Sequence, residues 1–503
     1  MRNKPEAEDY DGVFRSKFSR RESSPIEPEI VFTPSAAAAI PANFTPRGAA
    51  STSATASTTT SVPGKKAKPK PSFMQVEAGQ WTDRPGHGLT FACLFLFSVV
   101  LYFRPYELIP ALSSLTSMAF YVGIVTLLVY VVSQLSVEGN LTARPREVDM
   151  VLLMGLAALL SIPMAIDPGE AWKTFSDLMI KTILIFIVIV NVVRTETRMR
   201  ILFWLVFVVS IYLSINVIRD YQAGVFKIGL AETNTLRVKG AINGMFDNSN
   251  DLALHLVTII PIAFVLGIEK KGLIRKLIYF PIALLMLSAV IITFSRGGFL
   301  GTIAMTLVLA RKLGRRNRTA ALATLVLGFI FFIAVAPATY SGRLATIFDS
   351  SSDITGSSSQ RTEIMKRSVW VALRYPIFGV GIGNFHFKSF HELGTHNAYT
   401  QVASETGIAA MICYIILCVH PIRKLRMIER EMFERNDNSH LYYLAIGLQA
   451  SLVGYMVSSF FAAVAYQWYV YYLVGYAICI RRVYYLQESK KLNSAPAGST
   501  IQV

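Results

Sequence analysis

The segment from Pro376 to Ala410, PIFGVGIGNFHFKSFHELGTHNAYTQVASETGIAA, holds the residues best suited to chemistry in a largely apolar chain. His396 is a candidate general base, because an imidazole with a pKa of about 6.5 can accept a proton near neutral pH. Asn397 beside it could orient a substrate or cap the next helix. Glu405 could pair with His396 or an arginine, or relay a proton. The simpler role for His396 is an interfacial anchor. Glu405 nearby and the arginines expected at the same membrane surface favour catalysis.

Two arginines are candidates for binding an anion on the same side. Arg296 lies between apolar stretches and is followed by two glycines, which allow close approach of a ligand to the backbone. A permanently charged, planar guanidinium suits a phosphate or diphosphate, whereas the simpler role is a snorkelling anchor. Arg237, in TNTLRVKGAINGMFDNSNDLA, is the second candidate. Asn250, which closes the NSN stretch, is a substrate-binding candidate, although capping the next helix is its simpler role.

The remaining polar residues give weaker signals. Arg361 and Arg367 lie on a predicted amphipathic helix, where they would be solvated or contact lipid phosphate; Arg361 is retained as a substrate-binding candidate. His386, His391 and His396 lack the Cys or acidic partners of a zinc site, so neither a metal nor a cofactor is expected. The GVGIG run has no surrounding βαβ unit and indicates only flexible backbone near a ligand. All four cysteines fall in apolar runs, which favours buried thiols.

Composition indicates an all-α, polytopic membrane protein. Of 503 residues, 53% are hydrophobic and 16% charged, against about 25% charged in soluble chains. Apolar runs recur at about 20 residues, the length that crosses a bilayer. Twelve transmembrane helices are expected, near 89–103, 111–135, 148–166, 175–193, 200–218, 251–268, 274–294, 297–310, 319–338, 396–419, 441–463 and 465–480.

Charge and composition predict the topology around these helices. The net charge of +17 comes from Lys and Arg clusters between apolar runs, which orient spans and do not suggest nucleic acid. Basic residues concentrate in loops 136–147, 194–199, 269–273, 311–318 and 420–440, which places these loops and both termini on the cytoplasmic side of the membrane. The expected parts are a disordered tail at 1–88, a transmembrane domain at 89–485, and a C-terminal tail at 486–503.

Two long loops, 219–250 and 339–395, are expected on the outer side of the membrane. Long connectors in helix bundles are often functional. Residues 360–374 have a helical period with Met365, Val369, Ala372 and Leu373 on one face, so this stretch is predicted to form an amphipathic helix on the outer interface. Glycines and serines before it suggest a hinge.

Together these residues resemble the O-antigen ligase and polymerase superfamily of bacterial membrane glycosyltransferases, over about 89–485. The matching pieces are SRGG at 295–298, Arg237 and Gly240 before NSN at 248–250, PIFGVGIGNF, and the HN pair at 396–397 followed after nine residues by Gly407. Ser249 departs from the pattern, because the family often has Pro between the two asparagines.

The resemblance implies a GT-C-like, metal-independent enzyme at the periplasmic face of the bacterial inner membrane, with loops 219–250 and 339–395 in the periplasm. Its donor would be a glycan on undecaprenyl diphosphate. By position, Arg296 and Arg237 would bind the diphosphate, and His396 would activate the acceptor hydroxyl. The acceptor is open: lipid A-core for a ligase, a growing polysaccharide for a polymerase, or a protein hydroxyl for an O-oligosaccharyltransferase. A transporter or flippase is a more distant alternative, because no internal repeat of the kind common in transporters is evident.

Overall fold

The computed structural model describes residues 81, 86–109, 112–113, 117–225, 238, 246, 248–269, 272–337 and 357–494. These residues belong to one compact unit, Pro69–Val503. Within them the chain forms helices and no strand. The predictions for the N-terminal tail before Trp81, for Arg237 with most of loop 219–250, for the hinge before α14 and for the last nine residues lie outside the described residues.

Most helices before residue 270 are joined by short connectors, and the connector from α8 to α9 is the long exception. Arg104 separates α2 from the short α3, and Asp167 caps α6 by accepting hydrogen bonds from the Gly169 and Glu170 amides. A π-helical turn, η3, joins α6 to α7. The bounds are α2 Gly88–Phe103, α3 Pro105–Leu108, α4 Met118–Glu138, α5 Arg146–Ser161, η2 Ile162–Met164, α6 Pro168–Thr174, η3 Phe175–Met179, α7 Ile180–Val192, α8 Glu196–Gln222 and α9 Ser249–Ile268.

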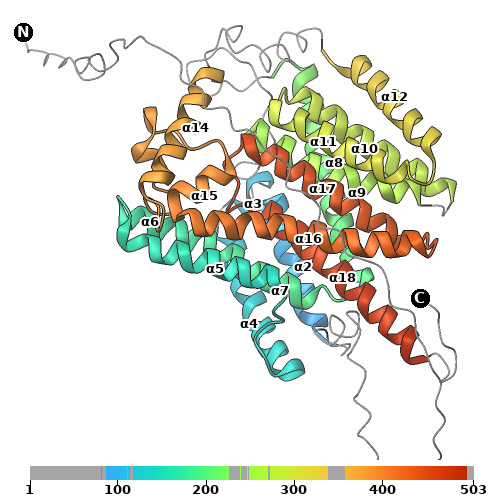
Figure 1. Cartoon of the computed structure of the whole chain (residues 1–503), viewed down its shortest axis with the longest axis horizontal. Helices are drawn as coiled ribbons and strands as arrows, with labels where there is room; N and C mark the ends of the chain where they lie inside the picture. Colours follow the sequence, from blue (N-terminus) through green and yellow to red (C-terminus); the bar gives the residue numbers. More distant parts are fainter. Residues whose placement is uncertain are drawn as a thin grey trace, which may run out of the picture. The chain divides into compact units, whose positions relative to one another are not determined.

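The second half of the bundle packs around α9 and α17. Figure 1 shows α9, α11 and α17 side by side, and α17 contacts both of the others. The bounds are α10 Leu273–Ile292, α11 Arg296–Leu313, α12 Arg318–Val335, α14 Ser357–Arg374, η5 Phe385–Lys388, η6 Phe390–Glu392, α15 Ala398–Thr406, α16 Ile408–Glu434, α17 His440–Ser458, η7 Ser459–Phe461 and α18 Trp468–Ser494.

The fold class predicted from composition is confirmed. Nine helices of the described part are long and apolar enough to cross a membrane. Helices α11, α12 and α18 correspond to the three further predicted spans but fall outside that set, so the count of twelve stays a prediction.

Two predicted boundaries around residue 400 are wrong. The span expected at 396–419 is two helices, because Gly407, with φ of 96°, ends α15 before α16 begins. The loop expected at 420–440 is largely helical, since α16 continues to Glu434. Pairs such as Arg430–Glu434 support its polar last turns.

The predicted amphipathic helix is present as α14, but its faces are divided differently. Val371 and Ala372 are buried, and Ile364 packs with Phe385 in a small core. Val369 and Leu373, expected on the same face as Ala372, are exposed. The helix therefore packs on protein along one side and leaves apolar side chains uncovered along the other.

Buried ion pairs join the helices at one end of the bundle, called here the Glu269 end. Glu269 caps the C-terminus of α9 and meets His440 of α17 at 2.8 Å and Arg275 of α10 at 3.3 Å. Arg481 of α18 donates two hydrogen bonds to Glu147 at the start of α5. The opposite end, where Asn248 caps α9, is called the Asn248 end.

Candidate functional site

The glycine-rich run before α15, from Gly379 to Gly383, packs against this helix and is called here the clasp. The amides of Val380 and Gly381 donate to the Ser404 and Glu405 carbonyls at 2.9 and 3.0 Å. A Cβ atom on Gly379, which has φ of 65°, would lie 2.4 Å from the backbone of Glu405. These glycines therefore permit close packing of backbone on backbone, which differs from the ligand-contacting loop that the GVGIG run suggested.

His396 lies immediately before α15, with a left-handed φ of 50°. Its side chain is partly buried. Burial and, second, the positive charge of Arg361 on α14 lower the pKa of His396 to about 4. The imidazole is therefore neutral at neutral pH, the protonation state that a general base needs. The structure thus places the positive charge of Arg361 near enough to His396 to act on the pKa of its imidazole.

Asn397 is the N-cap of α15. Its Oδ1 accepts hydrogen bonds from the Tyr399 and Thr400 amides at 2.9 and 3.0 Å, the usual role of a capping Asn. The side chain is 2% exposed, and its Nδ2 has no hydrogen-bond partner in the described part of the chain. A buried unsatisfied donor is costly, and this one belongs to the residue that follows His396.

Glu405 lies on the buried side of α15 and contacts the clasp. Its Oε2 accepts the Gly383 N–H at 3.1 Å, and the Tyr466 hydroxyl lies beside the carboxyl group. Burial raises the pKa of Glu405 to about 7, although both neighbours oppose the shift. The hydrogen bond goes to the clasp rather than to His396, so this acid holds the helix in place.

Arg296 is the first residue of α11, at the Asn248 end of the bundle. Ser295 caps this helix by accepting the Gly298 N–H, and its Oγ donates to Asn250 Oδ1 at 2.9 Å. Asn250 itself follows Asn248, the cap of α9. The predicted substrate-binding residue Asn250 therefore links the N-termini of α9 and α11, directly beside Arg296.

The end of α17 connects the Arg296 region to the His396 region. Ser458 Oγ donates to the Gly297 carbonyl at 3.1 Å. Two residues earlier, the Met456 carbonyl accepts the Tyr399 hydroxyl of α15 at 2.9 Å. The ring of Tyr399 also lies 6.4 Å from that of Phe460 in η7. Arg296 and His396 are far apart in sequence. They thus lie at the starts of α11 and α15, and both helices contact the end of α17.

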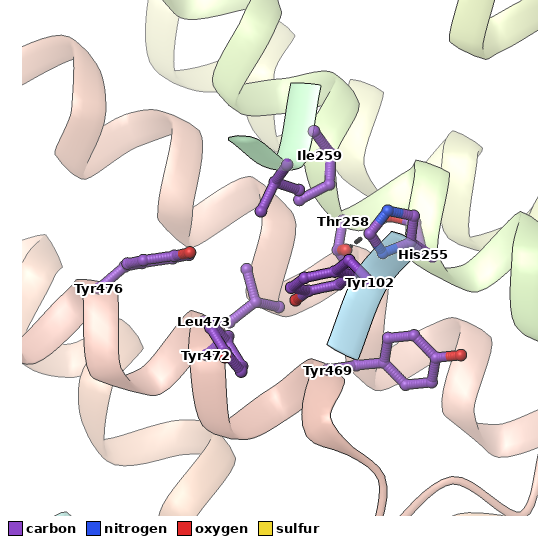
Figure 2. A pocket seen from close by; sticks show the side chains of 9 residues that line it. Tyr102, His255, Thr258, Ile259, Tyr469, Tyr472, Leu473 and Tyr476 are labelled. Carbon is purple, nitrogen blue, oxygen red and sulfur yellow. Dashed lines mark hydrogen bonds between the residues drawn. The ribbon is translucent and has the colours of Figure 1, made fainter. Parts of the chain in front are cut away.

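A small cavity lies between α2, α8, α9 and α18 (Figure 2), with a volume of about 10 Å³. It is lined mostly by aromatic and hydroxyl side chains and by His255, which shares a hydrogen bond with Ser210 at 3.1 Å. A space of this size holds about one water molecule, so it cannot receive a sugar. In the described residues, no group of three His, Cys, Asp or Glu side chains is placed to hold a metal ion.

Sequence reasoning missed the residues that position the site. Ser295 was read only as part of an SRGG run, although a Ser before a helix start is a recognisable cap. Tyr399 and Tyr466 could not be found, because their partners, Met456 and Glu405, are distant in the sequence.

The fold and the site define an integral membrane protein of the helical class. A neutral histidine, His396, and an arginine, Arg296, lie at the starts of two helices that both contact the end of α17. The family model described as O-antigen ligase matches residues 281–415, which include α11, α14 and α15. These residues carry that family's domain, in agreement with the O-antigen ligase/polymerase superfamily, and the match supports a membrane glycosyltransferase. No curated protein matches the chain.

Proposed function

We propose that this protein transfers a glycan from undecaprenyl diphosphate to an acceptor hydroxyl at the periplasmic face, as an O-antigen ligase. The observation that carries the proposal is the shared turn at the end of α17, which contacts both the Arg296 and the His396 helix starts. Both lie within the matched family segment.

The proposed reaction assigns one task to each residue. The neutral imidazole of His396 accepts the proton of the acceptor hydroxyl as its oxygen forms a bond to C1 of the donor sugar. The bond from C1 to the diphosphate oxygen breaks, and the diphosphate leaves with the electron pair. Arg296, together with Arg237, stabilises the developing negative charge. This charge stabilisation requires no metal.

Helix geometry supports an anion at this place. Helices α9 and α11 begin beside each other, and α15 begins on the turn that α11 contacts. Each helix N-terminus carries about half a positive charge, which favours a nearby phosphate. Asn397 Nδ2, which has no hydrogen-bond partner among the described residues, is a further donor, which we assign to an oxygen of the sugar or acceptor.

The test is glycan transfer by variants expressed in a strain that lacks the gene. Arg296→Ala should lower transfer about 10²–10³-fold, the cost of one lost transition-state contact. His396→Gln should lower it about 10²–10⁴-fold, the contribution of a general base. Two matched controls are Arg374→Ala, an exposed arginine on α14, and His386→Gln in η5. Near-normal transfer by both site variants at normal protein levels would exclude the proposed roles.

The same strain distinguishes the alternative acceptors. Loss of long glycan on lipid A-core with accumulation of lipid-linked polymer indicates a ligase. Accumulation of single lipid-linked repeat units indicates a polymerase. Loss of glycan from proteins alone indicates an O-oligosaccharyltransferase. Glycan transfer by the purified protein under conditions in which no lipid is flipped would exclude a flippase.

A further inference from the structure

A groove lies between the start of α2 and the second half of α4, with a volume of about 510 Å³. Its apolar walls include Leu89 of α2 and Leu128 and Val132 of α4, which are 69%, 62% and 68% exposed. Both helices are among the candidate membrane spans. The volume falls within the usual range of about 300–1,000 Å³ for small-molecule sites.

The groove lies within one bilayer leaflet. Its lining on α4 runs from Leu128 to Ser133, about 7.5 Å at 1.5 Å per residue, and Leu128 lies about 15 Å along the helix from Glu138, about half the hydrocarbon thickness of a bilayer. Glu138 pairs with Arg194 at 2.6 Å, and Glu196, two residues on, lies 3.6 Å from His440, so this end of α4 is at the Glu269 end and the groove runs from there toward the bilayer centre. Part of one acyl chain fits this length and this apolar environment.

Polar groups gather where the groove reaches the Glu269 end. His87 shares a hydrogen bond with the Ser133 hydroxyl at 2.9 Å, and both line the groove. The buried His87 Nε2 and Thr90 Oγ1 have no partner within the described ranges. An otherwise apolar groove therefore has a polar mouth.

The charge at this mouth is positive. The positive charges of Arg194 and Arg198 act on the His87 imidazole, and so does the negative charge of Glu138. Arg194 is paired with that acid. Arg198 donates only to the carbonyls of Val192 and Gly86 and lies over the Phe91 ring, with no carboxylate partner among the described residues. Within the described part of the chain, the guanidinium charge of Arg198, on a partly exposed side chain next to the groove, thus has no compensating carboxylate.

We infer that the groove between α2 and α4 binds an anionic phospholipid of the leaflet at the Glu269 end. One acyl chain lies along Leu89, Leu128 and Val132, and the phosphate pairs with Arg198. This lipid is distinct from the glycan donor, because the groove lies at the Glu269 end whereas Arg296 and His396 begin helices at the Asn248 end. The inference does not depend on the proposed function.

The test compares phosphatidylglycerol with phosphatidylcholine of identical acyl chains, each added to the purified full-length protein in detergent. Native mass spectrometry counts retained lipids. Wild type should retain phosphatidylglycerol about fivefold more strongly, the factor that corresponds to about 1 kcal/mol for one basic side chain at a membrane surface. Arg198→Gln should abolish this preference, and Val132→Trp, which fills the groove, should reduce retention of both lipids. Leu96→Trp, on an exposed part of α2 outside the groove, is the control and should behave as wild type.

Equal retention of the two lipids by wild type would overturn the inference, as would an unchanged preference in Arg198→Gln. If Val132→Trp does not fold, Leu128→Trp tests the same wall. Unchanged retention after filling the groove would place the lipid elsewhere.

Discussion

The charge of Arg361 should set the acid limb of the pH–activity profile. Arg361 is the second cause, after burial, that lowers the pKa of His396 from 6.5 to about 4. A general base works only when deprotonated, so activity rises with pH through this pKa. The wild-type protein should therefore be nearly fully active from about pH 6 upward and lose half its activity at about pH 4.

Arg361→Gln removes a positive charge and should raise the pKa of His396. The total shift is about 2.5 units, and burial is the larger cause, so the charge accounts for less than about 1.2 units. If the pKa rises to about 5, the neutral fraction of His396 at pH 5 falls from about 0.9 to about 0.5. Arg361 also lies among the substrate-binding candidates, so the whole curve can drop, but the position of its acid limb is a separate quantity.

The assay is kcat/KM for glycan transfer by purified protein between pH 4 and 8, since this ratio reports the free enzyme. Arg374→Gln, on the same helix but exposed, should leave the limb in place. A wild-type limb near pH 6.5 would show that His396 is not the desolvated base described here. A limb that moves to lower pH in Arg361→Gln would refute the electrostatic reasoning.

Three further predictions concern the parts that hold the site. Ser295→Ala removes the cap of α11 and the hydrogen bond to Asn250, so it should destabilise the protein by about 2 kcal/mol and lower transfer. In thermal unfolding, the double variant with Asn250→Ala should lose less stability than the sum of the losses in the two single variants. Gly407→Ala places a Cβ 2.1 Å from the Ile377 carbonyl oxygen and should lower the yield of folded protein in size-exclusion chromatography, whereas Gly394→Ala, with nothing within 4 Å, should not. Glu147→Gln leaves the buried Arg481 unpaired and should cost about 3–5 kcal/mol; a melting temperature equal to that of wild type would contradict this.

The sequence predicts the helices well because hydrophobic length and caps are local properties. Arg296 and His396 are candidates from the sequence alone because an ionisable residue beside apolar sequence is conspicuous in a membrane protein. The break at Gly407 was missed, since one glycine inside an apolar run is also compatible with a continuous helix. The break depends on the Ile377 carbonyl, which approaches Gly407 from a different segment of the chain, and such a contact cannot be read from local sequence.

The support of the site is nonlocal for the same reason. No spacing rule connects Tyr399 with Met456 or Asn250 with Ser295, because these pairs depend on how whole helices pack. The division of α14 was also unpredictable: a helix with apolar residues on two sides has no single amphipathic face, so its inner side is chosen by the core that forms around Phe385.

The paired charges at the Glu269 end have a consequence for mutagenesis. Contacts such as Glu147 with Arg481 and Glu269 with His440 fasten the helices on the side away from the proposed chemistry. Replacing the side chain of Arg296 or His396 leaves these ion pairs intact, so the chain can still insert and accumulate while transfer is lost. Inactive variants at these two residues therefore report on chemistry, and poorly expressed variants at the Glu269 end report on assembly.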